Sequence, residues 1–285
     1  MKFSSIASGL ALAGAAFAAP PCHKRGYNTT LPTTTVAGVE VIDTPIVRAV
    51  RTFIEDYYKD YQPYLTNHLY RTWLFGAAAI NNNATLKASL DLEVHAVGSM
   101  LHDLGWDIKP HSPYVTAEYS FEIDSGRFAM EWIKNWTAVN GGAAEWDEVR
   151  LQKVNLGVLL QTFIGSTDFA FPESYWITKS IGFEFPVGES PLIGSENYDN
   201  IWKAYSNSTL FRGSNFTFTN MAAYKPAATY TTFIADFGLH YVPGYNNSAN
   251  TLFSLIQGGL QGEVAEYPDV PFVQKIPPNG ANPLM

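Results

Sequence analysis

An apolar stripe at helical spacing runs directly into an adjacent histidine and aspartate. Its members, which recur at intervals of three or four residues, are Leu90, Val94, Val97, Leu101 and Leu104. This spacing is typical of an amphipathic helix that buries one face against a core. His102 and Asp103 are therefore expected at the end of a buried helix, where packing can hold both side chains in a fixed orientation.

A second histidine completes a candidate metal site. His68 lies upstream in TNHLYRTWLFG, beside the short apolar pattern of Leu69, Trp73 and Ala77 that predicts another helix. Imidazole nitrogens and a carboxylate are ligands that suit Zn, Fe or Mn, and a site with an open position can activate water. The alternative is that each histidine is an ordinary helix residue, because His-Asp is a common dipeptide.

Further pieces of the chain strengthen the metal interpretation. In order they read NHLYRTWLFG, LHDLGW, FEIDSG and GSTDF, and a closing stretch reads IADFGLHYVPGY. This ordered set, within about Val47 to Tyr245, resembles the fungal HD-domain proteins that are similar to cyanamide hydratase. The resemblance implies an all-α HD-domain helical bundle with a loop-rich C-terminal segment. It also implies one divalent metal, Zn or Fe, held by His68, His102, Asp103 and Asp168.

The chain departs from this family at one position. The family carries the element W-[DE]-x-I-x-L-H-T, and the matching run from Trp146 to Lys153 places Gln152 where the histidine is expected. Glutamine cannot take up a proton near neutral pH, which implies a different chemistry, a different substrate or reduced activity. Asp103 and Gln152 are the predicted catalytic residues, with Asp103 or bulk water moving the proton. Cyanamide itself is disfavoured as the substrate.

The resulting hypothesis is a secreted, metal-dependent hydrolase or hydratase that acts on a small molecule through a metal-activated water. One alternative is a secreted HD phosphohydrolase or phosphodiesterase, which would favour a second metal and more basic residues near the site. Another is a non-catalytic, metal-binding member of the family that has lost activity, for which Gln152 is the argument.

Two more residues are predicted to bind the substrate. Arg71 lies about one helical turn after His68 and can pair with a carboxylate or with a substrate anion. His111, in the loop sequence KPHSPY, can reach the mouth of the pocket, because binding residues concentrate on loops.

Three other polar residues are each open to two roles. His95 shares a helix face with His102 and is expected to be structural, with the orientation of a ligand as the alternative. Glu122 and Asp124 of the FEID element can orient metal ligands, but Asp124 can equally cap the helix that follows.

Composition and charge limit the domain count and the partners. The 285 residues are 46% hydrophobic without a repeat or an internal linker, which indicates a single domain over 26–285. The pattern is helical from about Ile46 to Phe163, whereas 171–224 reads as long loops, and a loop is preferred to a strand over 216–219. A net charge of -8 without a basic cluster argues against nucleic acid, which leaves a small-molecule substrate as the expected partner.

The N-terminal residues are predicted to be processed. Residues 1–18 combine a lysine, an apolar run and the small-residue sequence AFA, as signal peptides do. The dibasic pair Lys24-Arg25 marks 19–25 as a possible propeptide, and its removal would take away Cys22, the only cysteine. No other stretch is long and apolar enough for a membrane anchor, so the chain is expected to be secreted.

Six sequons support secretion, because Asn-x-Ser/Thr is the acceptor for N-glycosylation in the secretory pathway. They are Asn28, Asn83, Asn135, Asn207, Asn215 and Asn246. Each acceptor is expected on the surface of the folded chain.

N-terminal sequencing of protein secreted by a fungal host is expected to begin at Gly26, because a kexin-type protease cuts after a dibasic pair. A start at Ala19 or Pro20 would show that Lys24-Arg25 is not cut, while leaving the signal peptide intact.

Overall fold

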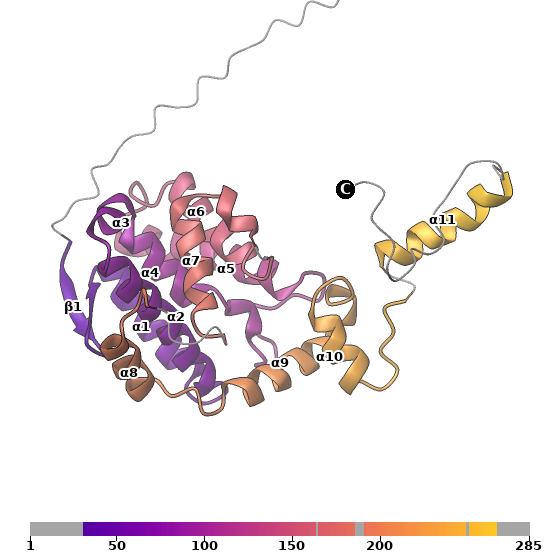
Figure 1. Cartoon of the computed structure of the whole chain (residues 1–285), viewed down its shortest axis with the longest axis horizontal. Coiled ribbons are helices and arrows are strands. Elements are labelled where there is room, and N and C mark those ends of the chain that lie inside the picture. Colours follow the sequence, from indigo (N-terminus) through magenta and orange to yellow (C-terminus); the bar gives the residue numbers. More distant parts are fainter. Residues whose placement is uncertain (1–30, 164, 186–190, 249–250, 267–285) are drawn as a thin grey trace, which may run out of the picture.

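The computed structural model describes residues 31–163, 165–185, 191–248 and 251–266, and this part is almost entirely helical. The predicted all-α fold is therefore confirmed. In chain order the elements, with η for 3₁₀ helices, are β1 (Thr33–Val36), β2 (Val39–Ile42), α1 (Pro45–Tyr58), α2 (Pro63–Asn81), α3 (Ala84–Ser89), α4 (Leu92–Leu101), η1 (Leu104–Trp106), α5 (Phe121–Asn140), α6 (Glu148–Leu159), η2 (Ser166–Phe169), α7 (Pro172–Gly182), α8 (Ser195–Ala204), α9 (Leu210–Tyr224), η3 (Pro226–Ala228), α10 (Ile234–Tyr241) and α11 (Leu252–Glu266). In Figure 1 the helices α1 to α7 gather into one bundle, α9 and α10 extend from it, and α11 lies apart.

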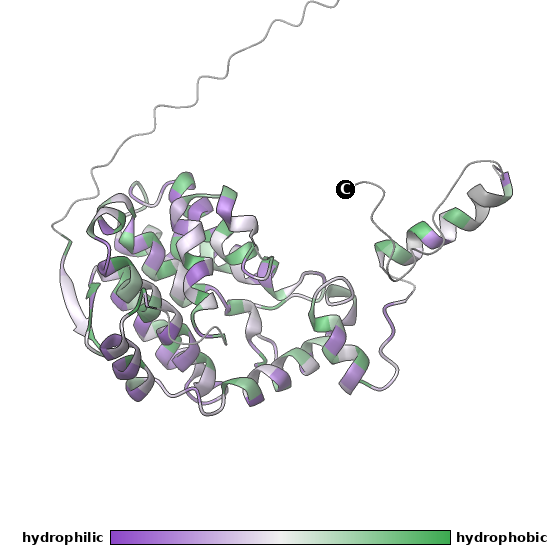
Figure 2. Ribbon diagram, viewed as in Figure 1, coloured by the Kyte–Doolittle hydropathy of each residue, from purple (hydrophilic) through white to green (hydrophobic). Residues whose placement is uncertain are grey.

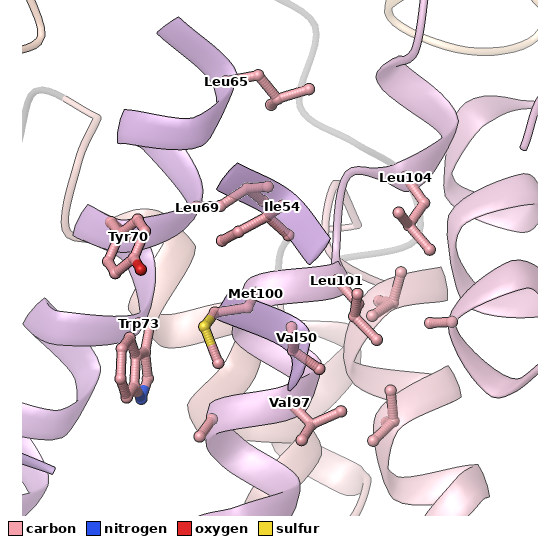
Figure 3. Close-up of a cluster of buried hydrophobic side chains, with 14 of the residues drawn as sticks. Val50, Ile54, Leu65, Leu69, Tyr70, Trp73, Val97, Met100, Leu101 and Leu104 are labelled. Carbon is pink, nitrogen blue, oxygen red and sulfur yellow. The ribbon is translucent and has the colours of Figure 1, made fainter. Parts of the chain in front are cut away.

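The core lies where α2 and α4 meet α1. Figure 3 shows Leu69 of α2, Ile54 of α1 and Leu101 of α4 pointing into the same space, with Met100 and Trp73 beside them. The predicted stripe is confirmed, because all five of its apolar side chains are buried. Burying one such side chain contributes about 1.5–3 kcal/mol, so this face fixes how α4 sits in the bundle.

The start of α4 is fixed by Asp91, the first polar residue beside the stripe. Its Oδ1 accepts a hydrogen bond from Val94 N at 3.2 Å, which satisfies one of the free amides at the helix N-terminus. Arg150 of α6 then binds Asp91 through Nε at 2.8 Å and Nη2 at 3.0 Å. This contact ties α6 to the helix that ends at His102.

Helix α4 ends at Leu101, with His102 in the C-capping position. Gly105 follows in η1, where a Cβ would collide with the carbonyl oxygen of Phe121, so glycine is needed for the close approach of α5. The capping role predicted for Asp124 is wrong, because α5 begins at Phe121 and its N-cap is Ser120.

The segment 171–224 is more helical than predicted, since α7, α8 and α9 cover most of it. The run 216–219 lies within α9, where Thr217 and Phe218 are buried. The predicted loop over 216–219 is therefore wrong, because burial of these two side chains stabilises a helix in a segment whose Pro, Gly and Asn content predicted loops. A short hairpin of β1 and β2 was not predicted, and its turn uses Ala37 and Gly38, both with positive φ.

Helix surfaces follow the expected division between buried and exposed faces. In Figure 2 most helices carry both hydrophobic and hydrophilic residues, and α8 is mainly hydrophilic, with Ile201 as its buried residue. Within the described ranges, no helix is both long enough and apolar enough to cross a membrane.

The asparagines of the sequons differ in how exposed they are. Asn83, Asn135, Asn207 and Asn246 are exposed, as expected for glycan acceptors. Asn215 is half-buried in the middle of α9 and donates a hydrogen bond to Tyr241 Oη at 3.2 Å. Asn28, together with the predicted signal peptide and propeptide, lies outside the described residues.

Gly76→Ala is expected to lower the free energy of unfolding by about 1–3 kcal/mol, because overpacking a tight helix crossing is destabilising. A Cβ at Gly76 of α2 would overlap the Ser180 hydroxyl and the His95 ring, which themselves lie 3.0 Å apart. Urea denaturation measures the effect, with Gly182→Ala as control, since nothing lies within 4 Å of a Cβ there. Equal midpoints for the two variants would contradict this account of the crossing.

Candidate metal site and pocket

Three buried side chains converge at the junction of α2, α4 and η1. His68 comes from α2, His102 caps the C-terminus of α4, and Asp103 precedes η1. The two Nε2 atoms lie 3.1 Å apart, and each lies 3.1 Å from Asp103 Oδ2. Among the described residues these three form the group whose ligand atoms could hold a metal ion.

The hydrogen-bond partners of the two imidazole rings indicate which ring nitrogen carries a hydrogen. His102 Nδ1 lies 2.8 Å from the carbonyl oxygen of Ser99, and His68 Nδ1 contacts Glu184 Oε2. A carbonyl and a carboxylate only accept hydrogen bonds, so both Nδ1 atoms donate. In its neutral form each ring therefore presents an Nε2 lone pair to the centre of the group, where a proton or a metal ion can bind.

This arrangement requires a positive charge at its centre. Asp103 Oδ1 is buried without a hydrogen-bond partner among the described residues, and Oδ2 lies 3.1 Å from Nε2 of His68 and of His102. A buried carboxylate in this position is stabilised by a positive charge, either a proton on His68 or a cation shared by all three groups. Two ligands 3.1 Å apart and each ~2.1 Å from one ion subtend about 95°, between octahedral and tetrahedral values. The site therefore fits a metal ion.

The electrostatics of the site favour the same conclusion. Burial lowers the pKa of His68, but the negative charges of Glu184 and Asp103 outweigh it and raise that pKa to about 9. Burial raises the pKa of Asp103, but His102 and His68 more than offset it, so that the pKa is lowered. The two carboxylates therefore favour a cation at this position, and a divalent ion supplies more positive charge than a proton does.

Arg71 supports the site through Glu184, the carboxylate that contacts His68. It forms an ion pair with Glu184 Oε1, and its Nη1 donates to the carbonyl oxygens of Tyr205 at 3.1 Å and Ser206 at 2.7 Å. The predicted pairing of Arg71 with a carboxylate is therefore observed. Its predicted contact with substrate is not, because the side chain is 0% exposed and does not line the pocket.

Glu184 was missed by sequence reasoning. It follows α7 in the stretch IGFEFP, inside the segment predicted to be loops. Its carboxylate bridges Arg71 and His68, an arrangement that commonly fixes the orientation of a metal-binding histidine. A buried arginine signals that some acidic partner exists, but the sequence does not indicate which one.

A pocket of about 900 Å³ opens onto His68 and Asp103. Its lining includes a group of aromatic residues that contact one another, here named the aromatic wall, made of Trp106, Phe121, Phe218 and Phe233. The neutral polar lining residues, here named the polar wall, are Gln161, Thr162, Thr167 and Thr178. Tyr175, Ile181, Phe183 and Phe185 line the pocket as well. Asp168 and Lys179 also line the pocket and are exposed.

Asp168, the predicted fourth ligand, is not part of the three-residue cluster. It lies in η2, outside the bundle core, and reaches only the lining of the pocket. The structure therefore brings together His68, His102 and Asp103, and the ligand role of Asp168 stays a prediction.

The structure places Gln152 away from the pocket. Its Nε2 donates to Glu148 Oε1 at 2.8 Å, and its Oε1 accepts from Asn155 Nδ2 at 3.2 Å. The glutamine that lines the pocket is Gln161, which donates to the carbonyl oxygen of His102 at 3.0 Å. The signal was available, because Leu160-Gln161-Thr162 keeps both the leucine and the threonine of the L-H-T element.

The remaining predicted residues also lie outside the cluster. His111 is exposed in its loop with a φ of 58° and does not line the pocket. Glu122 accepts a hydrogen bond at 2.7 Å from Thr162, and so supports the polar wall. Asp124 forms a buried ion pair with Lys225 at 2.9 Å.

His95 has the structural role that was expected. It is buried against Ser180, and burial lowers its pKa to about 3, which keeps the ring neutral. It makes no contact with the three-residue cluster that the structure records, so orientation of a metal ligand is not supported.

Neither the models of known protein families nor the curated proteins give a match to this chain. Function is therefore argued from the site itself.

His102→Gln and Asp103→Asn are each expected to abolish the binding of one equivalent of metal, because each removes a coordinate bond from a three-residue set. Elemental analysis of the purified variants measures this loss. Asp168→Asn is the matched control from the same pocket and is expected to keep the metal. Full metal retention in Asp103→Asn would rule out the proposed ligand set.

Proposed function

We propose that this protein is a metal-dependent hydrolase or hydratase that acts on a neutral small molecule, with one divalent ion, Zn or Fe, held by His68, His102 and Asp103. The observation that carries the proposal is the convergence of three buried acceptors at the base of a pocket. Bound there, such an ion lowers the pKa of a water toward ~7 and polarises an electrophile beside it.

The protein contributes orientation around this centre. Glu184 and the Ser99 carbonyl hold the two imidazoles through their Nδ1 hydrogens, so each ring has one fixed direction. Trp106 stacks on His68 at a centroid distance of 5.5 Å and an interplanar angle of 10°. This packing restricts the ring and limits the access of bulk water.

Asp103 is the residue best placed to move a proton. Its Oδ2 faces the two histidines, whereas its Oδ1 is a buried acceptor without a hydrogen-bond partner among the described residues. A carboxylate oxygen in that position can accept a hydrogen from an attacking water. Gln152 is too remote for this role, and Gln161 can orient the substrate through its place in the polar wall.

The charge of the pocket favours a neutral electrophile, such as an amide or a nitrile, over a phosphoester. Phosphoryl groups are recognised by several cationic groups. Lys179 is the cationic side chain among the lining residues, and Asp168 balances it, while Arg71 is buried behind Glu184. We also propose secretion, on the signal sequence and sequons alone.

The metal-loaded protein is expected to turn over a member of a panel of amides and nitriles, and not phosphoesters. Asp103→Asn should lower kcat by at least ~100-fold, since it removes both a ligand and the proposed base. Gln161→Ala is expected to lower kcat/KM by about 10-fold through the loss of orientation, and Gln152→Ala should leave turnover unchanged.

Three outcomes would contradict parts of the proposal. Turnover of phosphoesters alone would show that the electrophile class is wrong. A metal-loaded protein without turnover on the panel would favour the non-catalytic alternative. If Gln152→Ala and Gln161→Ala lowered kcat/KM equally, the assignment of substrate orientation to Gln161 rather than Gln152 would be wrong.

A further inference from the structure

The pocket is far larger than the smallest substrates of its proposed chemistry need. Its volume of about 900 Å³ lies near the upper end of the range for small-molecule sites, ~300–1,000 Å³. A nitrile or amide with a few heavy atoms would leave most of this space to water. The pocket therefore has room for a substantial group attached to the reacting centre.

The aromatic wall indicates what kind of group is attached to the reacting centre. Trp106 and Phe218 meet edge to face with centroids 4.7 Å apart, and Phe218 and Phe233 do so at 5.0 Å. Trp106 in turn stacks on His68, so aromatic surface runs without interruption from the metal ligands outward. Phe218 is buried, whereas Phe233 is 40% exposed, which places Phe233 at the outer end.

Such a wall suits a planar aromatic ligand. Aromatic rings pair favourably in edge-to-face or offset geometry beyond the gain from burial alone. Phe121 also meets Phe233 edge to face at 6.0 Å, so the rings of the wall support one another rather than collapse into the pocket. A flat ring lying against this surface would gain contacts that an alkyl chain of the same length would not.

The polar residues of the lining carry no net charge. The polar wall offers hydroxyl and amide groups, and Lys179 and Asp168 contribute one charge of each sign. A charged ligand would find no cluster of opposite charge among the described lining residues. The lining thus favours a neutral molecule that has both apolar and polar groups.

We infer that the substrates are neutral aryl compounds, such as aromatic amides and nitriles, whose ring packs on the aromatic wall. The reacting group named here rests on the proposed function. The selectivity for an aryl body rests on the pocket alone and can be tested by binding.

Binding to the metal-loaded full chain is measured by calorimetry with four probes: 2-naphthamide, benzamide, acetamide and 2-methylnaphthalene. The two aryl amides are expected to bind at least ~10-fold more tightly than acetamide. Phe218→Leu and the more exposed Phe233→Leu should each reduce this preference several-fold with unchanged metal content. Phe53→Leu, on α1 and outside this pocket, is the matched aromatic control.

2-Methylnaphthalene tests the ring alone, because it has no amide. It is expected to bind more tightly than acetamide, and Phe218→Leu should weaken it about as much as 2-naphthamide. Binding of 2-methylnaphthalene that is no tighter than that of acetamide would overturn the role of the aromatic wall.

The outcomes separate this inference from the proposed function. Tight aryl binding without turnover would support the inference while contradicting catalysis on these compounds. Turnover of acetamide or other small amides without aryl preference in binding would overturn the inference while leaving the hydrolase proposal intact. A preference that survives in both Phe218→Leu and Phe233→Leu would also overturn it, since the aromatic wall would not be its source.

Discussion

Three buried side chains that converge on one point inside the bundle are the interaction on which the rest of this structure depends. His68, His102 and Asp103 are buried, and Asp103 Oδ2 lies 3.1 Å from both imidazole Nε2 atoms. A buried carboxylate in this position needs a positive charge beside it, which a proton on His68 or a shared metal ion supplies. Metal binding and folding stability are therefore expected to be linked, because a ligand that binds only the folded state stabilises it.

The site also joins parts of the chain that are distant in sequence. Arg71 in α2 reaches Glu184 after α7 and the carbonyl oxygens after α8, while Asp91 links α4 to Arg150 of α6. These contacts tie α2 and α4, which carry the two imidazoles, to α6 and to the segments after α7 and α8. The tight packing around η1, where Gly105 allows α5 to approach, then places Trp106 beside His68. Orientation at the site is thus a property of the whole bundle.

The sequence predicted the parts of this account that local patterns determine. The apolar stripe placed His102 and Asp103 at a buried helix end, and the all-α fold followed from the same periodicity. Glu184 was beyond reach, because the partner of a buried arginine is chosen by tertiary packing. Gln152 was preferred to Gln161 through the alignment of one short motif, and only the geometry placed Gln161 beside His102. The helix over 216–219 was missed because its surroundings, rich in Pro, Gly and Asn, predicted a loop, whereas tertiary burial of Thr217 and Phe218 stabilises the helix.

X-ray absorption at the edge of the copurified metal, on the full chain, tests the central claim most directly. The account predicts two imidazole nitrogens and a carboxylate oxygen bound to one ion at ~2.0–2.2 Å, with water completing the shell. Multiple scattering from two imidazole rings would identify the histidines as ligands. A spectrum without imidazole scattering, or a natively folded protein that neither contains nor takes up a divalent ion, would contradict the account, because His68, His102 and Asp103 would then share a proton instead.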